Sequence, residues 1–458
     1  MISKYLVKST SGVRGVIGKG LTASMFVDYG AALGTVLLRK AGAGPLVVGR
    51  DSRPSGEHLS KAFIAGAQSV GMPVVDLGIV PTPTVELAIP GLKARGGVCI
   101  TASHNPSEWN ALKFFNDAGE FINEKSFLAL ELVLASRDFK YKPHDKLGTV
   151  TGDDRWIERH IAATLKLPGV SAAVVRRRKF TVVVDAVNGA GSLALPEFVE
   201  RLGAKVVRLH CEPTGLFPRA PEPTPERLSK LSEAVRRHKA DLGLACDPDA
   251  DRLALVDETG RPIGEELTLT LAVEQVLRTK PTTVAVNLST SRATVDVARR
   301  LGAKVYLSRV GEANVVAEMK KRGALIGGEG NGGVIYGALH YGRDSLVGAG
   351  LVLTLLAKAG VSLSTLAGTI PRYYNTKTKA PLPEGFESRL EAFAKAFKRE
   401  RPELTVDDRD GVRMDFNDGW LLIRKSNTEP IYRIVVETND AALTRTILAR
   451  VKRDFKQG

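Results

Sequence analysis

Short apolar runs that alternate with helical patterns constrain this chain more than any other feature of its sequence. The runs at residues 45–48 and 97–100 are typical of buried strands, whereas residues 56–70 are typical of a helix. Such alternation predicts layers of mostly parallel sheet covered by helices. Beyond about residue 370 the pattern indicates antiparallel strands instead. We therefore expect an α/β fold, with three similar α/β domains that have mixed sheets and a smaller C-terminal α+β domain.

A recurring hexapeptide supports this division into units. Arg-Leu-Gly-Ala-Lys-Val occurs at residues 201–206 and again at residues 300–305. In both copies a glycine follows a helical pattern and precedes an apolar strand, which is the usual signal for the end of a helix. A chain of 458 residues is also too long for one hydrophobic core. The expected domain limits are residues 1–150, 151–257, 258–370 and 371–458.

Charge and apolar content exclude several classes of protein. The formal net charge is +15, but the basic residues are spread out and no nucleic-acid motif accompanies them. We expect no nucleic-acid partner, and a basic surface that steers a small anionic substrate. The apolar run at residues 346–357 is shorter than the roughly 18 residues that a membrane span needs. With no signal peptide and three unpaired cysteines, we expect a cytoplasmic protein without a membrane partner. Its oligomeric state does not follow from the sequence.

The segment Thr101–Pro106, with the sequence Thr-Ala-Ser-His-Asn-Pro, follows a predicted strand that ends at Ile100. Asn-Pro interrupts any regular element, so we expect Ser103 on a loop at the end of this strand. α/β proteins place their chemistry on such loops, and a hydroxyl there is a nucleophile when a neighbour activates it. The alternative is a capped turn in which Ser, His and Asn bond the nearby backbone.

The segment Asp247–Arg252 reads Asp-Pro-Asp-Ala-Asp-Arg. In an extended chain alternate residues point the same way, so Asp247, Asp249 and Asp251 are expected to converge. Close carboxylates repel unless a cation lies between them, and oxygen-only ligands favour Mg²⁺. A solvated acidic turn is one alternative, and a phosphatase with an aspartyl nucleophile is another. A calcium-binding EF-hand loop is excluded, because Arg252 stands where that loop needs glycine.

Two later loops carry polar groups. Gly328–Gly333 has the spacing of a dinucleotide signature, but residues 334–337 do not open a helix, as that motif requires. A loop that brings Glu329 and Asn331 to a polar ligand fits better, with a plain turn as the alternative. Arg424–Pro430 follows a strand, and its cation, hydroxyls and amides could form a phosphate cradle. A capped surface turn is the alternative there.

Together and in this order, the four loops resemble those of the α-D-phosphohexomutase family. They are similar to its phosphoserine, metal, sugar and phosphate loops, at residues 101–106, 247–252, 328–333 and 424–430. Further similar segments are residues 10–15, 49–53, 109–113 and 185–191. The resemblance spans the whole chain. It implies four domains around a central active-site cleft, with one loop from each domain.

This resemblance also implies a reaction, the transfer of a phosphoryl group between O1 and O6 of a hexose phosphate. Phosphorylated Ser103 would donate its phosphate, and a 1,6-bisphosphate intermediate would turn over in the cleft and return the other phosphate. Mg²⁺ and hexose 1,6-bisphosphate are the implied cofactors, and a small phosphosugar is the implied partner. The implied catalytic residues are Ser103, Lys113, Arg14, His104 and Arg252. The implied metal ligands are Ser103, Asp247, Asp249 and Asp251. The implied substrate-binding residues are Glu329, Asn331, Arg424, Ser426, Asn427 and Thr428.

The identity of the sugar is less constrained. Many family members have serine in place of Asn331 and histidine in place of Gly333. Ser-Asn-Thr at residues 426–428 is more usual in the phosphomannomutase/phosphoglucomutase branch, whereas Glu429 is closer to phosphoglucosamine mutases. The sugar loop resembles a divergent branch associated with glucosamine phosphate. We expect phosphoglucosamine mutase activity, with phosphomannomutase/phosphoglucomutase as the alternative and a Mg-dependent phosphatase using Asp247 as a remoter one.

Overall fold

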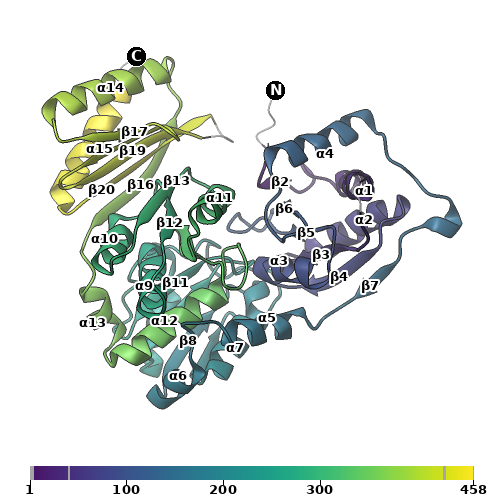
Figure 1. The fold of residues 1–458 in the computed structure, drawn as a ribbon, viewed down its shortest axis with the longest axis horizontal. Helices are drawn as coiled ribbons and strands as arrows, with labels where there is room; N and C mark the ends of the chain where they lie inside the picture. Colours follow the sequence, from purple (N-terminus) through teal and green to yellow (C-terminus); the bar gives the residue numbers. More distant parts are fainter. Residues whose placement is uncertain (1–4, 40–41, 427–429, 457–458) are drawn as a thin grey trace.

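The computed structural model describes residues 5–39, 42–426 and 430–456. Four sheets follow one another along the chain, each with its own helices (Figure 1). The N-terminal unit lies at the right of Figure 1 and the C-terminal unit at the upper left, with the two central units between and below them. The expected fold class is confirmed, whereas the domain limits at residues 150, 257 and 370 stay predictions.

The first sheet is mixed and has seven strands. In spatial order they are β1 (Leu6–Ser9), β2 (Gly12–Val16), β6 (Trp109–Phe115), β5 (Gly96–Ile100), β3 (Leu46–Arg50), β4 (Val74–Ile79) and β7 (Val150–Gly152). Its helices are α1 (Ala23–Leu38), α2 (Gly56–Ser69), α3 (Thr82–Gly91) and α4 (Glu124–Ser136), with a short 3-10 helix η1 (His144–Lys146). Strands β5, β3, β4 and β7 run parallel, and β6, β2 and β1 join antiparallel.

The second and third sheets share one arrangement of four strands. The second contains β11 (Leu253–Asp257), β10 (Leu242–Cys246), β8 (Thr181–Asp185) and β9 (Lys205–Leu209). The third contains β15 (Gly333–Tyr336), β14 (Ile326–Glu329), β12 (Val284–Asn287) and β13 (Val305–Ser308). In each, three strands are parallel and the first named is antiparallel. The central strands β6, β5, β3 and β4 of the first sheet repeat this order.

The second and third units each have their own helices. Those of the second unit are α5 (Trp156–Leu165), α6 (Ala172–Arg178), η2 (Ala190–Leu193), α7 (Leu195–Leu202), η3 (Pro225–Arg227) and α8 (Ser229–His238). Those of the third are α9 (Glu265–Thr279), α10 (Arg292–Arg300), α11 (Glu312–Arg322), α12 (Ser345–Ala359) and α13 (Leu363–Gly368). Both copies of the hexapeptide end a helix as predicted, with Gly203 at φ +113° after α7 and Gly302 at φ +79° after α10.

Three of the four functional loops occupy the same place in the three related sheets. Residues 101–108 connect β5 to β6, residues 247–252 connect β10 to β11, and residues 330–332 connect β14 to β15. Each loop therefore leaves the carboxyl end of a parallel strand and returns along an antiparallel one. This edge is where open α/β sheets bind ligands.

The C-terminal sheet differs because all of its strand pairs are antiparallel. In spatial order it contains β16 (Tyr374–Pro381), β20 (Ile431–Thr438), β19 (Gly419–Lys425), β18 (Val412–Phe416) and β17 (Thr405–Asp407). Its helices are α14 (Phe386–Glu400) and α15 (Ala441–Lys456). The predicted phosphate loop connects β19 to β20.

Helix α12 contains the longest apolar run and joins two cores. Its residues Leu346 and Val352 pack with Phe198 of the second unit, whereas Val347 and Leu351 pack in the core of the third. A helix that is apolar on all sides is a buried one. None of the helices in the described part of the chain combines the length and apolar composition that a membrane crossing requires.

Candidate active site

Ser103 lies on the loop after β5, as the sequence predicts, and a buried arginine holds that loop in place. The guanidinium of Arg53 donates to the carbonyl oxygens of Ser103 and Asn105 at 2.7 Å each. Those two bonds come from Nη2, whereas Nη1 donates to the carbonyls of Pro106 and Trp109 at 2.6 and 3.1 Å. Four loop carbonyls therefore share one cation, and such charge-assisted bonds are stronger than neutral ones.

A second contact chain fixes the backbone at Ser103. The carboxylate of Asp51 binds Arg53 Nε at 3.0 Å and accepts the Thr101 hydroxyl at 2.6 Å. Thr101 Oγ1 in turn accepts the amide of Ser103 at 2.9 Å. Ser103 has φ +48°, a left-handed conformation that is uncommon for a residue with a side chain. The surrounding bonds hold this strained backbone, which aims the Ser103 side chain into the pocket.

The metal loop brings its three carboxylates together, but by a different route from the one expected. The sequence predicted an extended chain over Asp247–Arg252. Instead the segment is a turn, in which the amide of Ala250 donates to the carbonyl of Asp247 at 3.0 Å and Ala250 has φ +54°. The turn wraps the backbone around the carboxylates, so that one oxygen from each of Asp247, Asp249 and Asp251 lies within 4.8 Å of the others.

The partners of these carboxylates leave room for a cation. Asp247 Oδ2 accepts the Ser103 hydroxyl at 3.0 Å. Lys113 Nζ binds Oδ2 of Asp249 at 2.6 Å and Oδ2 of Asp251 at 3.2 Å. The buried Oδ1 atoms of Asp249 and Asp251 have no hydrogen-bond partner among the described residues. Unpaired buried carboxylate oxygens are costly, so this all-oxygen donor set fits a hard divalent cation such as Mg²⁺.

Burial and charge set the protonation of this cluster. Burial, together with the charges of Asp251 and Asp249, raises the pKa of Asp247 well above its usual range. Burial alone would also raise the pKa of Asp251, but Arg343 and Lys113 hold it below its usual range. Burial alone would lower the pKa of Lys113, but Asp249 and Asp251 raise it, so Lys113 is a cation.

The predicted catalytic residues His104, Arg14 and Arg252 lie around Ser103. His104 Nδ1 is 3.3 Å from Ser103 Oγ, and Arg14 Nη1 donates to the Asn105 side chain at 3.5 Å. The charge of Arg252, burial and the charge of Arg14 lower the pKa of His104 well below its usual value. His104 is therefore a neutral imidazole beside the serine hydroxyl.

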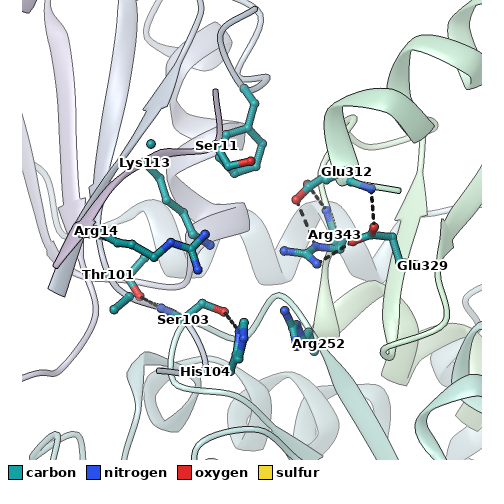
Figure 2. A pocket seen from close by; sticks show the side chains of 15 residues that line it. Ser11, Arg14, Thr101, Ser103, His104, Lys113, Arg252, Glu312, Glu329 and Arg343 are labelled. Carbon is teal, nitrogen blue, oxygen red and sulfur yellow. Dashed lines mark hydrogen bonds and ion pairs between the residues drawn. The ribbon is translucent and has the colours of Figure 1, made fainter. Parts of the chain in front are cut away.

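Glu329 of the predicted sugar loop faces this group from the third unit (Figure 2). Its Oε1 accepts Asn287 Nδ2 at 2.8 Å and the amide of Gly311 at 3.0 Å, and its Oε2 accepts Arg343 Nη1 at 2.8 Å. Arg343 also binds Glu312 Oε2 through Nε at 3.0 Å. Glu329 thus lines the pocket as a carboxylate that protein donors already orient.

Arg343 and Glu312 were missed at the level of the sequence, yet both line the pocket. Arg343 Nη2 binds Asp251 Oδ2 at 2.6 Å, so this one guanidinium connects the metal loop to the sugar loop. In Figure 2 Arg343 points from the third unit toward Arg252 and Ser103. No motif surrounds Arg343, but a cation three residues before the apolar run at residues 346–357 is the signal that could have drawn attention to it.

Other predicted binding residues lie further from Ser103. Asn331 accepts the amide of Gly333 at 3.1 Å and lines a separate, larger cavity of about 890 Å³ between the second, third and fourth units. Arg424 lies at the end of β19, 3.8 Å from Asp410, and burial lowers its pKa. Ser426 is buried next to it. Asn427 and Thr428 lie outside the described residues.

The structure thus brings one set of predicted residues to a single pocket of about 170 Å³. That set is Arg14, Ser103, His104, Lys113, Arg252 and Glu329. The pocket lies between the first and third units, and the metal loop of the second unit closes it from below (Figure 2). Their catalytic and binding roles remain predictions.

Sequence profiles of phosphoglucomutase/phosphomannomutase match nearly the whole chain. Its α/β/α domains I, II and III match residues 6–140, 158–260 and 264–374, and its C-terminal domain matches residues 378–453.

Individual relatives and solved structures agree. The chain is 39% identical to a phosphoglucomutase/phosphomannomutase of Thermococcus kodakarensis over 96% of both chains. It is 35% identical to a probable phosphoglucosamine mutase of the same organism, over 100% of this chain and 99% of the relative. A phosphoglucomutase/phosphomannomutase family protein of Burkholderia thailandensis superimposes with a TM-score of 0.86 at 28% identity, over 97% and 96% of the two chains. An Aspergillus fumigatus N-acetylphosphoglucosamine mutase, solved with GlcNAc-6P and magnesium, has a TM-score of 0.62 at 15% identity, over 98% and 95%.

Proposed function

This chain belongs to the phosphoglucomutase/phosphomannomutase family, and we propose that it moves a phosphoryl group between O1 and O6 of a hexosamine or hexose phosphate through phosphorylated Ser103. Membership makes it an enzyme, a phosphohexomutase of the isomerase class. The single observation that carries the proposal is the position of Ser103 Oγ, 3.0 Å from Asp247 and at the wall of the pocket that Lys113 and Glu329 also line.

Two transfers make up the proposed cycle. In the first, the bond between phosphorus and Ser103 Oγ breaks and Oγ takes up a proton, while a bond forms from phosphorus to a sugar hydroxyl oxygen, which loses its proton. In the second, the other phosphate of the resulting bisphosphate returns to Ser103 Oγ, which loses its proton, and the sugar oxygen it leaves takes up a proton. Catalysis of such transfers is mainly positioning and stabilisation of charge.

The carboxylates of Asp247, Asp249 and Asp251, with the Ser103 oxygen, would hold Mg²⁺, which neutralises charge on a phosphoryl group when it is bound. The two orphaned Oδ1 oxygens in the loop support this assignment. The magnesium in the Aspergillus relative is consistent with it.

Lys113 and His104 would have different roles, one in stabilising charge and the other in proton transfer. Lys113 is held as a cation by two carboxylates, so it would supply positive charge and a hydrogen-bond donor rather than a base. Neutral His104, 3.3 Å from Ser103 Oγ, can take or return the proton at that oxygen. Arg14 and Arg252 line the same wall and would face the negative charge of a phosphate.

The remaining substrate contacts follow from the size of the pocket. A cavity of about 170 Å³ is small beside the roughly 300 Å³ of typical ligand sites, so a hexose phosphate would extend beyond it. We place the sugar against Glu329 and Asn331, and the phosphate that is not transferred against Arg424, Ser426, Asn427 and Thr428.

Glucosamine phosphate is the sugar we propose. On the wall of the third unit one cation, Arg343, pairs with two carboxylates, those of Glu312 and Glu329. The resulting negative balance would favour an ammonium group. Several relatives carry the name probable phosphoglucosamine mutase. Mannose and glucose phosphates are the alternatives, supported by the name of the Thermococcus relative that is 39% identical, a phosphoglucomutase/phosphomannomutase.

An isomerisation assay tests the function directly. The purified enzyme, with Mg²⁺ and a catalytic amount of hexose 1,6-bisphosphate, is given glucosamine, mannose and glucose 6-phosphates in parallel. We expect 1-phosphate product with all activity lost in chelator, and the highest kcat/KM for glucosamine. Release of inorganic phosphate without any 1-phosphate would instead identify the phosphatase alternative.

A further inference from the structure

A closed cluster of ionisable side chains lies beside the pocket without opening into it. The interdomain cluster, as we name it, consists of Glu86, His160, His340 and Asp344, all buried. Asp344 Oδ2 lies 2.8 Å from His160 Nε2 and 3.1 Å from His340 Nε2. On its other side His340 Nδ1 lies 3.3 Å from Glu86 Oε2. Two carboxylates thus flank one imidazole, which suits a protonated His340.

The four residues come from three units of the fold. Glu86 is on α3 of the first unit, His160 on α5 of the second, and His340 and Asp344 on the segment before α12 of the third. The fit is close, because a Cβ at Gly342 would lie 1.6 Å from Glu86 Oε2. Burial raises the pKa of Glu86 to about 8, and the carboxylates of Asp344 and Glu86 raise that of His340 to about 10 against its burial.

Helix α3 reaches the metal loop on one side. The hydroxyl of Thr82, its first residue, donates to Asp249 Oδ2 at 2.7 Å, and the amide of Thr82 donates to the Asp249 carbonyl at 2.9 Å. One turn further along the same helix, Thr84 Oγ1 lies 2.9 Å from His160 Nδ1, and Glu86 meets His340. A single rigid helix therefore connects the interdomain cluster to the second carboxylate of the metal loop.

The segment around Asp344 reaches the metal loop on the opposite side. Arg343 donates to Asp251 Oδ2 at 2.6 Å, and the amide of Ser345 donates to the Ala250 carbonyl at 3.2 Å. Between them, Asp344 caps α12 by accepting the amide of Leu346 at 2.8 Å. Figure 2 shows the Arg343 side chain entering the pocket, whereas its neighbour Asp344 belongs to the cluster.

We propose that Glu86, His160, His340 and Asp344 are positioning residues that hold α3 and the 343–345 segment against the metal loop, and so set its affinity for the divalent cation. The cluster contributes no side chain to the wall of the pocket and no hydrogen bond to the three aspartates, although the charge of Lys113 helps to lower the pKa of Glu86 against its burial. It acts through Thr82 on one side and through Arg343 and Ser345 on the other. The inference rests on the proposed function, since it concerns the same cation site.

The test combines a structural readout with a kinetic one on the full chain. The variants are Glu86→Gln, His340→Gln and the double variant, and hydrogen exchange is followed at the amides of residues 247–252 without and with Mg²⁺. Removal of one charge leaves its partner buried and unpaired. For His340→Gln we expect about tenfold faster exchange in the metal loop and an about tenfold higher Mg²⁺ concentration for half-maximal activity, in line with the loss of outer-shell partners. The KM for the sugar phosphate should stay within about twofold of wild type.

The double variant distinguishes positioning from general destabilisation. Because it replaces both members of the Glu86–His340 pair and leaves neither ionisable group buried without the other, its exchange and Mg²⁺ dependence should recover partly toward wild type. The matched control is Glu437→Gln in the C-terminal unit, which removes an equally buried carboxylate that binds Trp420 and Asn375. This control should lower the melting temperature while metal-loop exchange stays at the wild-type rate.

Three outcomes would overturn the inference or its premise separately. If the wild-type enzyme is active and every cluster variant keeps wild-type metal-loop exchange and Mg²⁺ dependence, the cluster is merely structural. One ligand atom from each of His160, His340 and Asp344 lies within 4.8 Å of the others, so zinc binding is the rival explanation. If purified wild type holds tightly bound zinc and His160→Gln abolishes it, the cluster is a metal site instead. If wild type isomerises no sugar phosphate, the proposed function fails, while hydrogen exchange still reports on the positioning claim. Should His340→Gln fail to fold, the nearly isosteric Glu86→Gln carries the same test.

Discussion

Arg343 and Asp344 are neighbours in sequence, yet their side chains enter two buried ionic clusters of opposite character. Arg343 faces the metal loop, where two carboxylate oxygens have no hydrogen-bond partner within the described residues, and one of them, Asp251 Oδ1, lies 3.7 Å from Arg252 Nε. Asp344 enters the interdomain cluster, where each of its oxygens is used, one by two imidazoles and the other by the α12 amides. In the first cluster a bound cation would relieve the repulsion between carboxylates. The atoms of the second cluster pair with one another, although Glu86 Oε2 and His340 Nδ1 meet as an ion pair at 3.3 Å and not through a hydrogen bond.

This difference separates buried charges that serve the proposed function, in the metal loop, from buried charges that stabilise the fold, in the interdomain cluster. Burial, together with repulsion from Asp251 and Asp249, raises the pKa of Asp247, so the metal loop stores unfavourable energy in the absence of a cation. Favourable pairing holds the pKa of Asp344 below its usual range, even though burial alone would raise it. Substitutions in the two clusters should therefore change activity and stability in opposite proportions.

The largest effect is expected for Asp249→Asn. The change removes one charge of the cation site while keeping its shape, and both proposed transfers need that charge. We expect kcat to fall by about 10³-fold or more, while the melting temperature falls by less than in Asp344→Asn, because Lys113 keeps Asp251 as a partner. Steady-state kinetics and calorimetry measure the two quantities, with Asp138→Asn at an exposed carboxylate as the control. A strongly destabilised but fully active variant would reverse the comparison.

A smaller loss of activity is expected for Arg343→Lys. The planar guanidinium binds Asp251, Glu312 and Glu329 at once, which a lysine ammonium cannot reproduce. We expect kcat/KM to fall by about 10²-fold, with most of the loss in kcat, because the metal and sugar loops lose their common partner. Equal kinetics for the variant and the wild type would mean that Arg343 only fills space.

Asp344→Asn should affect stability more than any metal-loop substitution. It leaves a protonated His340 and a capped helix end without their carboxylate, and breaking a buried pair costs about 3–5 kcal/mol. Denaturant unfolding measures the change, and Asp249→Asn is the matched comparison. If both variants unfold at the wild-type midpoint, the two clusters do not differ as described.

The effect expected to be smallest over a single pH unit concerns the pH dependence of stability. The pKa of His340 is raised from 6.5 to about 10, chiefly by Asp344 and Glu86 against the effect of burial. The folded state therefore keeps a proton that the unfolded state loses, so this stabilisation is complete below pH 6.5 and is lost as the pH rises toward 10. The free energy of unfolding should fall by up to about 1.4 kcal/mol per pH unit in that window. The His340→Gln variant should show a flatter profile, and an unchanged slope would contradict the assignment.

Much of the fold followed from the sequence, because apolar runs and glycine-terminated helices are local signals. The residue types of the loops around Ser103 and Asp247 also indicated that these loops form a candidate site, and the structure brings them together. The turn at Ala250 was not predicted, since a left-handed alanine has no local signature. Arg53 and Arg343 were not singled out as site residues for a different reason. Each reaches partners on segments far away in the sequence, and only the folded chain brings those segments together.

The proposed function of the metal loop depends on one covalent step, the phosphorylation of Ser103. Intact-protein mass spectrometry followed by peptide mapping tests it most directly. A phosphoserine ester is stable enough to survive isolation, whereas an aspartyl phosphate is labile. We expect a one-phosphate adduct on part of the purified protein, located on Ser103, increased by hexose 1,6-bisphosphate and absent in Ser103→Ala together with nearly all isomerase activity. A phosphate on Asp247, with inorganic phosphate released and no sugar isomer formed, would contradict the account.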